Sequence, residues 1–426
     1  MSKKFSKISV IGLGYVGLPL SLQFARSGVL VLGFDLDQRK VDSINAGKTY
    51  LKHFSSESIA EQVDANRLEA TTDPSRLSEV EAILICVPTP LDDHREPDLS
   101  FVLDTARTIA PHLVKGVLVT LESTTYPGTT EDELRIVLEK GSGMKAGTDF
   151  HLAYSPERED PGREDASVKT IPKVVGGYTE KCAELAGALY EQALDKIHRV
   201  SSCRAAEATK LLENIFRSVN IALVNELKEV YEAMGIDVHE VIDAAATKPF
   251  GFMAFRPGPG LGGHCIPIDP FYLTWKAREF GKHTRFIELA GEINTAMPDY
   301  VISKVADALN DEGKAIKGSK VLILGLAYKA NVDDCRESPS FVLMQKLEAK
   351  GAVVEYNDIF LPVIPSTREH AHFTGKKSVE IEDAFDLILV STNHDEYKSF
   401  DFSGYSCPIV DSRNCISKKP QKYYNA

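Results

Sequence analysis

GLGYVG at residues 12–17 lies between an apolar run at residues 8–11, typical of a short buried strand, and a helix-like pattern of apolar residues at 18–25. A second strand-like run, residues 29–34, ends at an aspartate. In such a unit the first glycine allows a tight turn, the second lets the backbone approach a pyrophosphate, and the third lets helix and strand pack closely. The helix N-terminus would face the phosphates and the aspartate the ribose hydroxyls, which favours NAD over NADP. The cofactor contacts expected here are Gly12, Gly14, Tyr15, Val16, Gly17, Asp35 and Lys40.

The composition is that of an ordinary globular protein. Its 426 residues, 43% hydrophobic and 26% charged, suffice for two or three domains. A formal net charge of −12 makes a nucleic-acid partner unexpected. We expect no membrane contact, because no apolar run reaches about 18 residues and the N-terminus leads into a strand rather than a signal peptide. The seven cysteines form no CxxC pair, which indicates reduced thiols in the cytoplasm and no metal site.

Further apolar runs at residues 82–87, 116–121 and 150–154 are expected as parallel strands, the third being the last strand of this domain. Ligands of open α/β sheets bind at the carboxyl ends of such strands. The loops there therefore offer candidate cofactor contacts, namely Thr89, Ser123 and Thr124. In the same loop, Thr129 or Thr130 is expected to cap the next helix, a second role that involves different residues.

The loop that follows residue 154 is rich in charge. Glu157 is a candidate general base or substrate contact, while Arg158 and Arg163 are candidates for facing an anion. Taken alone, a loop of this composition is more often solvated surface.

Residues 203–234 contain no proline or glycine and predict one long helix of roughly 45 Å. Its apolar residues occupy more than one stripe, which favours a connector between domains or a dimer core. Lys210, Asn214 and Arg217 recur at i, i+4 and i+7 and share a face, which indicates an inward polar site. The alternative is that these three side chains form a solvent-exposed polar stripe.

Residues 257–270, PGPGLGGHCIPIDP, hold four glycines and four prolines and cannot form a regular helix or strand. Cys265 lies within this stretch, and Asp269 follows four residues later. A rigid loop that presents one thiol is what covalent catalysis through sulfur requires. The alternative is a tight structural loop whose cysteine is merely buried.

The remaining chain predicts helices at residues 271–279, 284–296 and 296–309, with a break at Pro298, and then a second α/β unit. That unit lacks the full glycine motif, so it either binds a nucleotide differently or serves as scaffold. The tail after Lys418 is expected to be frayed. The expected fold is α/β, with two Rossmann-like doubly wound domains joined by a long central helix. The expected domains are an NAD-binding domain at 1–200, a central helical domain at 201–312 and a C-terminal Rossmann-like domain at 313–426.

A thiol beside NAD suits one reaction. The thiol adds to an aldehyde to give a thiohemiacetal, hydride loss gives a thioester, and water releases a carboxylate. Lys210 would stabilise the oxyanion with Asn214 as a second donor, and Asp269 would act with Lys210 through a water in proton transfer. Glu157 would serve as acid or base, and Thr124 would hold the water.

Six sequence blocks resemble the UDP-glucose/GDP-mannose dehydrogenase family, in the family's order and over nearly the whole chain. They are GLGYVGLP at 12–19, CVPTP at 86–90, ESTTYPGTT at 122–130, KLLENIFR at 210–217, GLGGHCIPIDP at 260–270 and LAYKANVDDCRESP at 326–339. The stretches at 155–162 and 248–279 look like the branch acting on UDP-N-acetylhexosamines, in particular bacterial UDP-N-acetylglucosamine 6-dehydrogenases of surface-polysaccharide and O-antigen synthesis.

The resemblance implies a four-electron oxidation of the sugar C6 alcohol to a carboxylate, with two NAD turnovers. It implies Cys265 as the nucleophile and Arg336 as a cofactor contact from the C-terminal, UDP-sugar-binding domain. It also implies a cytoplasmic homodimer through the central helix, or a higher homo-oligomer. The implied substrate contacts are Glu157, Arg158, Lys210, Asn214, Arg217, Gly262 and Lys329.

Two positions depart from the family pattern. Arg256 stands where an aromatic residue is more usual, so its role is unassigned, and Arg158 puts a plain UDP-glucose substrate in doubt. UDP-GalNAc, UDP-ManNAc and UDP-glucose stay open as substrates beside UDP-GlcNAc, because epimers differ by the direction of one hydroxyl. A nucleotide-binding regulatory protein without catalysis is a further alternative.

Overall fold

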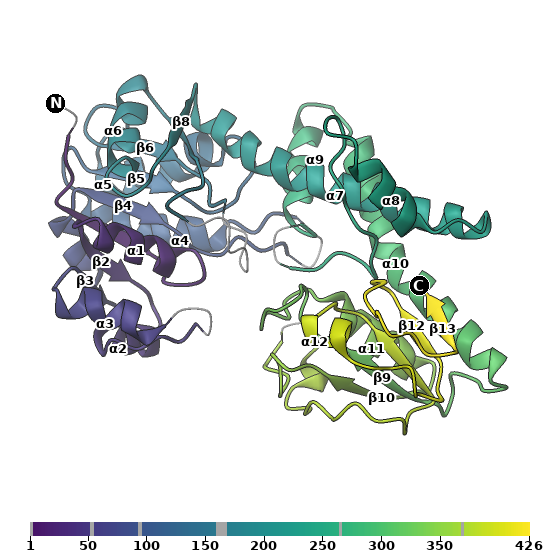
Figure 1. Cartoon of the computed structure of the whole chain (residues 1–426). Coiled ribbons are helices and arrows are strands. Elements are labelled where there is room, and N and C mark those ends of the chain that lie inside the picture. The colour runs from purple at the N-terminus through teal and green to yellow at the C-terminus, as the bar shows by residue number, and fades with distance from the viewer. Residues whose placement is uncertain (1–2, 52–54, 93–95, 159–167, 264–265, 368–369) are drawn as a thin grey trace. The chain divides into compact units, whose positions relative to one another are not determined.

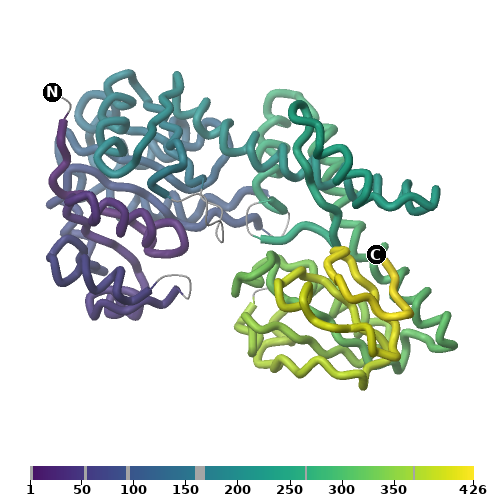
Figure 2. Tube along the Cα trace, in the orientation of Figure 1, coloured from purple at the N-terminus to yellow at the C-terminus, as the bar shows by residue number. Residues whose placement is uncertain are grey.

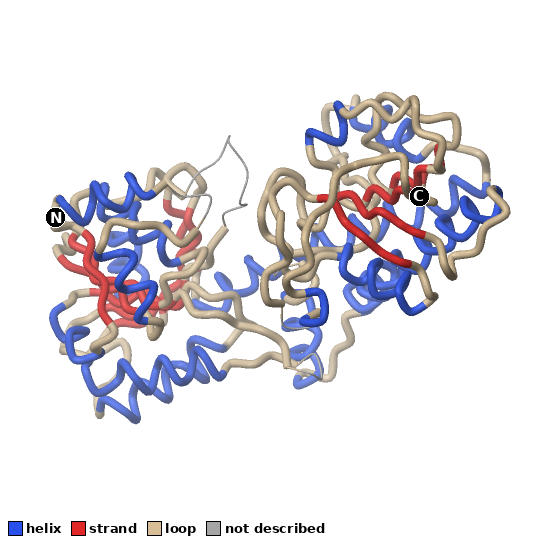
Figure 3. The backbone as a smooth tube through the Cα atoms, turned by 90° about the horizontal axis from the view of Figure 1, so that it is seen from below, coloured by secondary structure: helices blue, strands red, loops and turns tan. Residues whose placement is uncertain are grey.

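The computed structural model describes residues 3–51, 55–92, 96–158, 168–263, 266–367 and 370–426 (Figure 1). The chain forms two compact units, residues 1–213 with 271–283 and residues 214–270 with 284–426. In each unit the strands gather in one central sheet with helices around it (Figure 3). None of the helices in the described residues is long and apolar enough to cross a membrane.

The first unit is built on an eight-stranded sheet in the order β3-β2-β1-β4-β5-β6-β7-β8. All neighbouring strands are parallel except the pair β6 and β7, which is antiparallel. The strands are β1 (Lys7–Ile11), β2 (Leu30–Phe34), β3 (Leu68–Thr71), β4 (Ala82–Ile85), β5 (Leu118–Leu121), β6 (His151–Tyr154), β7 (Lys173–Gly177) and β8 (Ile197–Val200).

Helices cover both faces of this sheet, because successive strand side chains point to opposite faces. Ile8 and Val10 belong to one apolar cluster, with α1 and α6, whereas Ile83 and Ile85 belong to a second cluster, with α4 and α5. The sheet is therefore doubly wound. The helical segments of this unit are α1 (Gly17–Arg26), α2 (Gln38–Asn45), α3 (Ser56–Asp64), η1 (Pro74–Glu79), α4 (Ser100–Ile109), η2 (Ala110–His112), η3 (Thr129–Leu134), α5 (Arg135–Ser142) and α6 (Glu180–Tyr190).

The expectation that the strand near residues 150–154 ends this sheet is wrong, since β7 and β8 follow β6. The sequence of β7, KVVGG, begins with a charge and ends with two glycines, and β8, IHRV, has polar residues at its centre. Neither carries the uninterrupted apolar run by which a buried strand is recognised. Both form because β6 and the edge of the sheet offer unpaired backbone groups to them.

The second unit holds a five-stranded, fully parallel sheet in the order β10-β9-β11-β12-β13. Its strands are β9 (Lys320–Leu324), β10 (Val353–Asn357), β11 (Leu387–Val390), β12 (Ile409–Asp411) and β13 (Tyr423–Asn425). Its apolar side chains again fall into two clusters, one on each face. The remaining helical segments of the chain are α7 (Cys203–Ala233), α8 (Val238–Ala246), α9 (Asp269–Glu279), α10 (Arg285–Asp311), α11 (Pro339–Ala349), η4 (Ala371–Phe373) and α12 (Asp395–Ser399).

The predicted fold class is confirmed: two α/β sheets, the first parallel except for one pair and the second fully parallel, with the long helix α7 between them in the chain. The break expected at Pro298 is wrong, because α10 continues through that residue. A proline removes one backbone hydrogen bond, but Pro298 and its neighbours Met297 and Val301 are buried, and this packing keeps the helix intact.

The expectation that the tail after Lys418 is frayed is also wrong. β13 pairs with β12, and Ala426 is buried (the yellow end of the trace in Figure 2).

Candidate active site

The turn between β1 and α1 has the geometry that each glycine of GLGYVG predicts. Gly12 has a φ of +86°, and a Cβ there would lie 2.6 Å from the carbonyl oxygen of Cys86. A Cβ on Gly17 would lie 1.9 Å from the carbonyl oxygen of Gly12, so only glycine lets α1 pack this closely. A Cβ on Gly14 would meet no atom within 4 Å. The backbone at Gly14 is thus open for a ligand to approach.

Asp35 follows β2 and fixes this turn. The backbone N–H of Leu13 donates to Asp35 Oδ2 at 2.9 Å, and the Lys40 ammonium pairs with the same oxygen at 3.0 Å. The hydroxyl of Tyr50 donates to the carbonyl oxygen of Leu13, and burial raises the pKa of that phenol.

The N-terminus of α1 fits a pyrophosphate. Its N-cap residue, Val16, makes no side-chain capping bond, whereas α2, α3, α6, α8 and α11 are each capped by a side chain. The first amide groups of a helix need an acceptor and favour an anion. Together with Gly14 and Asp35, this end of α1 would hold NAD.

The loops after β4 and β5 lie at the carboxyl edge of the sheet, as predicted. Ser123 is buried, and its hydroxyl donates to the carbonyl oxygen of Val87 at 2.6 Å, which ties the two loops together. The hydroxyl of Tyr272, on α9, donates to the carbonyl oxygen of Thr89 at 2.8 Å. Thr124 is half-buried beside Ser123.

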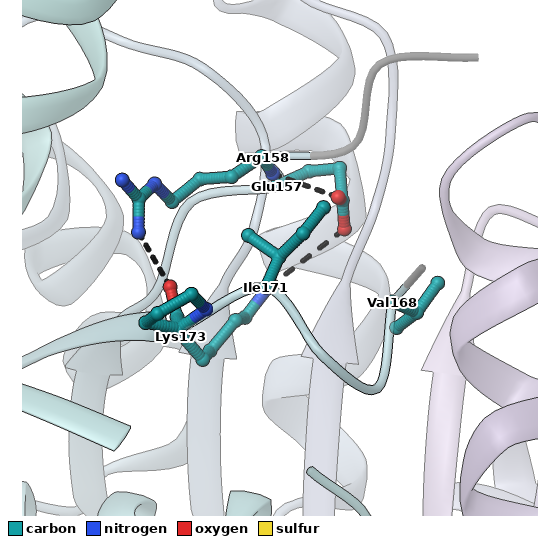
Figure 4. A pocket seen from close by; sticks show the side chains of 6 residues that line it. Glu157, Arg158, Val168, Ile171 and Lys173 are labelled. Atoms are coloured by element: carbon teal, nitrogen blue, oxygen red, sulfur yellow. Dashed lines mark hydrogen bonds and ion pairs between the residues drawn. The ribbon is translucent and has the colours of Figure 1, made fainter. Parts of the chain in front are cut away.

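Lys210 reaches the loop after β6. Its buried ammonium donates to the carbonyl oxygen of Glu157 at 2.6 Å. Arg158, predicted to face an anion, makes two bonds from its guanidinium to the carboxylate of Glu213, the nearer at 2.5 Å. Its predicted contact with the substrate stays a prediction. Glu157, Arg158 and Lys173 line a small pocket (Figure 4).

A buried charged cluster behind this loop was not predicted. Lys173 donates to Glu122 Oε2 at 2.5 Å, and the hydroxyl of Tyr190 donates to the other carboxylate oxygen of Glu122. Burial acts to lower the pKa of the Lys173 ammonium, but Glu122 and then Glu157 outweigh it and raise that pKa. In the sequence, the signal for this cluster is a lysine at the start of the short run KVVGG.

In the second unit, Asn214 and Asp269 lie together. The amide of Asn214, on α7, donates to Asp269 Oδ2, at the start of α9, at 2.5 Å, and both residues are buried. Arg217 is exposed in the single chain, and its predicted contact with the substrate stays a prediction.

Cys265 and His264 lie outside the described residues, and so does Arg163. The glycines before Cys265 are packed tightly: a Cβ on Gly262 would lie 2.8 Å from Tyr328 Cβ, and the N–H of Gly263 donates to the carbonyl oxygen of Arg336 at 3.2 Å. Arg413 was not predicted from the sequence. Its guanidinium lies where a side chain at position 258 would be. The same guanidinium donates to the carbonyl oxygen of Ser391 at 2.7 Å.

The loop after β9 carries the two cations implied for the C-terminal domain. Arg336 forms a bidentate pair with Asp334, with its Nη2 2.6 Å from Oδ2. Lys329 is half-buried. Arg256, the unassigned residue, is exposed and pairs with Asp243.

Three family models match the chain: the NAD binding domain of the UDP-glucose/GDP-mannose dehydrogenase family at residues 6–194, its central domain at 204–296 and its UDP binding domain at 322–418. A UDP-N-acetyl-D-glucosamine 6-dehydrogenase of Pseudomonas aeruginosa is 38% identical over 92% of both chains. A UDP-N-acetyl-D-mannosamine dehydrogenase of Pyrococcus horikoshii is 36% identical over 97% of both chains. A solved UDP-D-ManNAc dehydrogenase structure from P. horikoshii has a TM-score of 0.88 and 32% identity, covering 98% of this chain and 97% of its own.

Proposed function

The chain belongs to the UDP-glucose/GDP-mannose dehydrogenase family and is an NAD-dependent UDP-sugar dehydrogenase, and from this premise we propose that it oxidises the C6 hydroxyl of UDP-N-acetylglucosamine to the uronic acid. The observation that carries the mechanism is on α7. Lys210 and Asn214, one helical turn apart, are both buried and both bonded to residues with a predicted catalytic role, Glu157 and Asp269. Buried polar side chains on one helix face are costly unless they serve packing or chemistry.

NAD, when bound, accepts a hydride from C6 in each of the two oxidations. In the first, the alcohol proton passes through water to Asp269, and the Lys210 ammonium stabilises the oxygen as its negative charge develops. In the second, the Cys265 thiol adds to the aldehyde, so that its sulfur bonds to C6 and its proton passes to the carbonyl oxygen; loss of the hydride from C6 and of that proton to water leaves a thioester. Water held by Thr124 and Glu157 then attacks C6, the carbon–sulfur bond breaks, and the carboxylate and the thiol are released.

The substrate assignment rests on the 38% identity to the P. aeruginosa UDP-N-acetyl-D-glucosamine 6-dehydrogenase. UDP-N-acetylmannosamine is the second candidate, because the P. horikoshii UDP-D-ManNAc dehydrogenase matches this fold with a TM-score of 0.88. The two sugars differ only in the direction of the substituent at C2, and a site that hydrogen-bonds that substituent can discriminate strongly.

We extend the proposal to a cytoplasmic homodimer, or a higher homo-oligomer, that supplies a surface-polysaccharide precursor. Large apolar side chains on α7 support an association surface, since they are exposed in the single chain: Leu212, Phe216, Leu223 and Val230. Exposed apolar side chains along one long helix are typical of a protein interface.

The test is to count NADH per sugar. Purified protein is mixed with excess NAD and a limiting amount of UDP-GlcNAc, UDP-ManNAc, UDP-GalNAc or UDP-glucose, and absorbance is followed to completion. We expect two NADH per UDP-GlcNAc, and no complete turnover in Cys265→Ser. One NADH per sugar would show that the reaction stops at the aldehyde and that Cys265 has no covalent role. No NADH from any of the four sugars would refute the activity.

A further inference from the structure

We propose that Lys173 is a positioning residue for the active site, holding Glu157 and the loop that carries Thr124 in one arrangement. Its ammonium donates to Glu122 Oε2 at 2.5 Å and to the carbonyl oxygen of Pro156 at 3.1 Å, and it lies 3.9 Å from Glu157 Oε2. Figure 4 shows Lys173 pointing toward Glu157. This inference rests on the proposed function, in which Glu157 and Thr124 act on the substrate.

The antiparallel pairing of β7 is what brings Lys173 to this place. β6 ends at Tyr154, which pairs with Gly176, so the chain of β7 runs back along β6. Its first residue therefore lies at the carboxyl edge of the sheet, beside the segment that follows β6. If β7 ran parallel to β6, its first residue would lie at the opposite edge. The one antiparallel pair among the described strands thus delivers a cation to the ligand-binding edge.

The three contacts of Lys173 join two separate loops. Glu122 directly precedes Ser123 and Thr124 after β5, whereas Pro156 and Glu157 follow β6. One ammonium, with three N–H donors, thus crosslinks the two loops. The additional bond to Pro156 and the nearby Glu157 carboxylate connect the buried pair to the predicted catalytic side chains.

The surroundings of Lys173 are closed to solvent and carry a defined set of titratable groups. The side chain of Lys173 is 7% exposed and that of Glu122 0%. Glu122 faces it from the end of β5, Glu157 from the loop after β6, Tyr190 from α6 and Cys86 from the end of β4. The ring of Tyr190 lies 5.4 Å from the ammonium. At such a site a charge acts strongly on its neighbours, because water does not screen it.

The experiment compares four variants of the full-length enzyme. Lys173→Met removes the cation but leaves Glu122 buried, so we expect a lower melting temperature. The double variant Lys173→Met/Glu122→Gln removes both charges and is expected to recover much of the melting temperature. Lys173→Arg retains a cation. Tyr190→Phe is the matched control, since it removes a bond to Glu122 from the same buried cluster and leaves every contact of Lys173 in place.

We measure kcat and the KM for the UDP-sugar, and we divide kcat by the fraction of molecules that bind NAD. In the double variant we expect kcat to fall about 10- to 100-fold, the range that a misplaced catalytic group produces, with little change in KM. Lys173→Arg should keep most of the wild-type kcat, because it retains a cation, and Tyr190→Phe should keep all of it.

Two results would overturn the inference. If kcat in the double variant recovers together with the melting temperature, Lys173 serves stability alone. If kcat of Lys173→Arg falls as far as that of the double variant, the cation is not what holds the two loops. Wild-type turnover is measured first: its absence refutes the proposed function, whereas wild-type turnover matched by the double variant refutes this inference only.

Discussion

Gly14→Ala separates cofactor binding from folding, because its side chain would project into open space. A Cβ on Gly14 meets no atom within 4 Å, and its φ does not fall in the left-handed region. Gly17→Ala is the matched contrast. Its Cβ would lie 1.9 Å from the carbonyl oxygen of Gly12, and real Cβ contacts essentially never fall below 3.0 Å, so α1 would have to shift by about 1.1 Å.

These distances set the expected magnitudes. Gly14→Ala should leave the apo protein as stable as the wild type, or more stable by about 0.4–1 kcal/mol, since alanine restricts the unfolded chain. Gly17→Ala overpacks the contact between β1 and α1 at a cost of about 1–3 kcal/mol. For a unit of this size, that lowers the melting temperature by roughly 2–12 °C. The added methyl of Gly14→Ala lies where the pyrophosphate approaches, and we expect at least about tenfold weaker NAD binding, or 1.4 kcal/mol.

The assay pairs thermal melting without NAD with titration of NAD by calorimetry. Gly14→Ala should melt like the wild type and bind NAD weakly, whereas Gly17→Ala should melt lower even without NAD. If Gly14→Ala binds NAD like the wild type, the pyrophosphate does not lie against Gly14. If Gly14→Ala instead melts several degrees lower, the turn is packed more tightly than these distances indicate.

Three further predictions concern other parts of the chain. Asn214→Ala removes an amide donor from the buried carboxylate of Asp269, so urea denaturation should show a loss of about 1–3 kcal/mol, and unchanged stability would contradict that bond. Burial raises the pKa of Glu207 to about 7 from 4.5, so its contribution to stability is present below pH 4.5 and lost as the pH rises through 7. Glu207→Gln should therefore gain up to about 3 kcal/mol relative to the wild type between pH 4.5 and 8, and an unfolding free-energy difference that is independent of pH would refute this. Deleting residues 421–426 removes β13 and should lower the melting temperature, whereas a frayed tail would leave it unchanged.

The sequence predicted those parts of the fold that depend on local pattern. GLGYVG between two apolar runs fixes β1, α1 and β2, because turn, packing and periodicity all agree there. β3, β7 and β8 were not predicted, since they are short and obtain their stability from neighbouring strands. The continuity of α10 through Pro298 depends on burial, which a local rule about proline does not include.

The site residues also divide into those predicted from local pattern and those that depend on distant parts of the chain. Lys210 and Asn214 were predicted from their spacing on one helix, and both are buried. Lys173 was not predicted, because a lysine that opens a strand is usually a solvated edge residue. Its partner Glu122 lies 51 residues earlier in the chain, and only the antiparallel turn into β7 brings them together. The roles assigned to Cys265 stay predictions.

The two sheets begin with the same turn, and its details explain why only the first would bind a dinucleotide in this manner. Gly12 and Gly325 both have a φ of +86°, and both turns are held by an aspartate after the second strand of the sheet. Asp35 bonds to the N–H of Leu13 at 2.9 Å and Asp358 to that of Leu326 at 2.7 Å.

The difference lies in the space around each turn. In the first turn, the residue two positions after the first glycine is Gly14, which is open to solvent. In the second turn, the residue at the same position is Ala327, which is fully buried. The side chain of Asp35 is 10% exposed to solvent. The side chain of Asp358 is fully buried and bonds to His394 Nε2 at 3.2 Å. Ser338 caps α11, but no side chain caps α1. In the second turn a buried side chain fills the place of the pyrophosphate, the carboxylate bonds to His394, and one N–H of the next helix is capped. We therefore expect a nucleotide to bind that unit through other groups, such as the cations of the loop after β9.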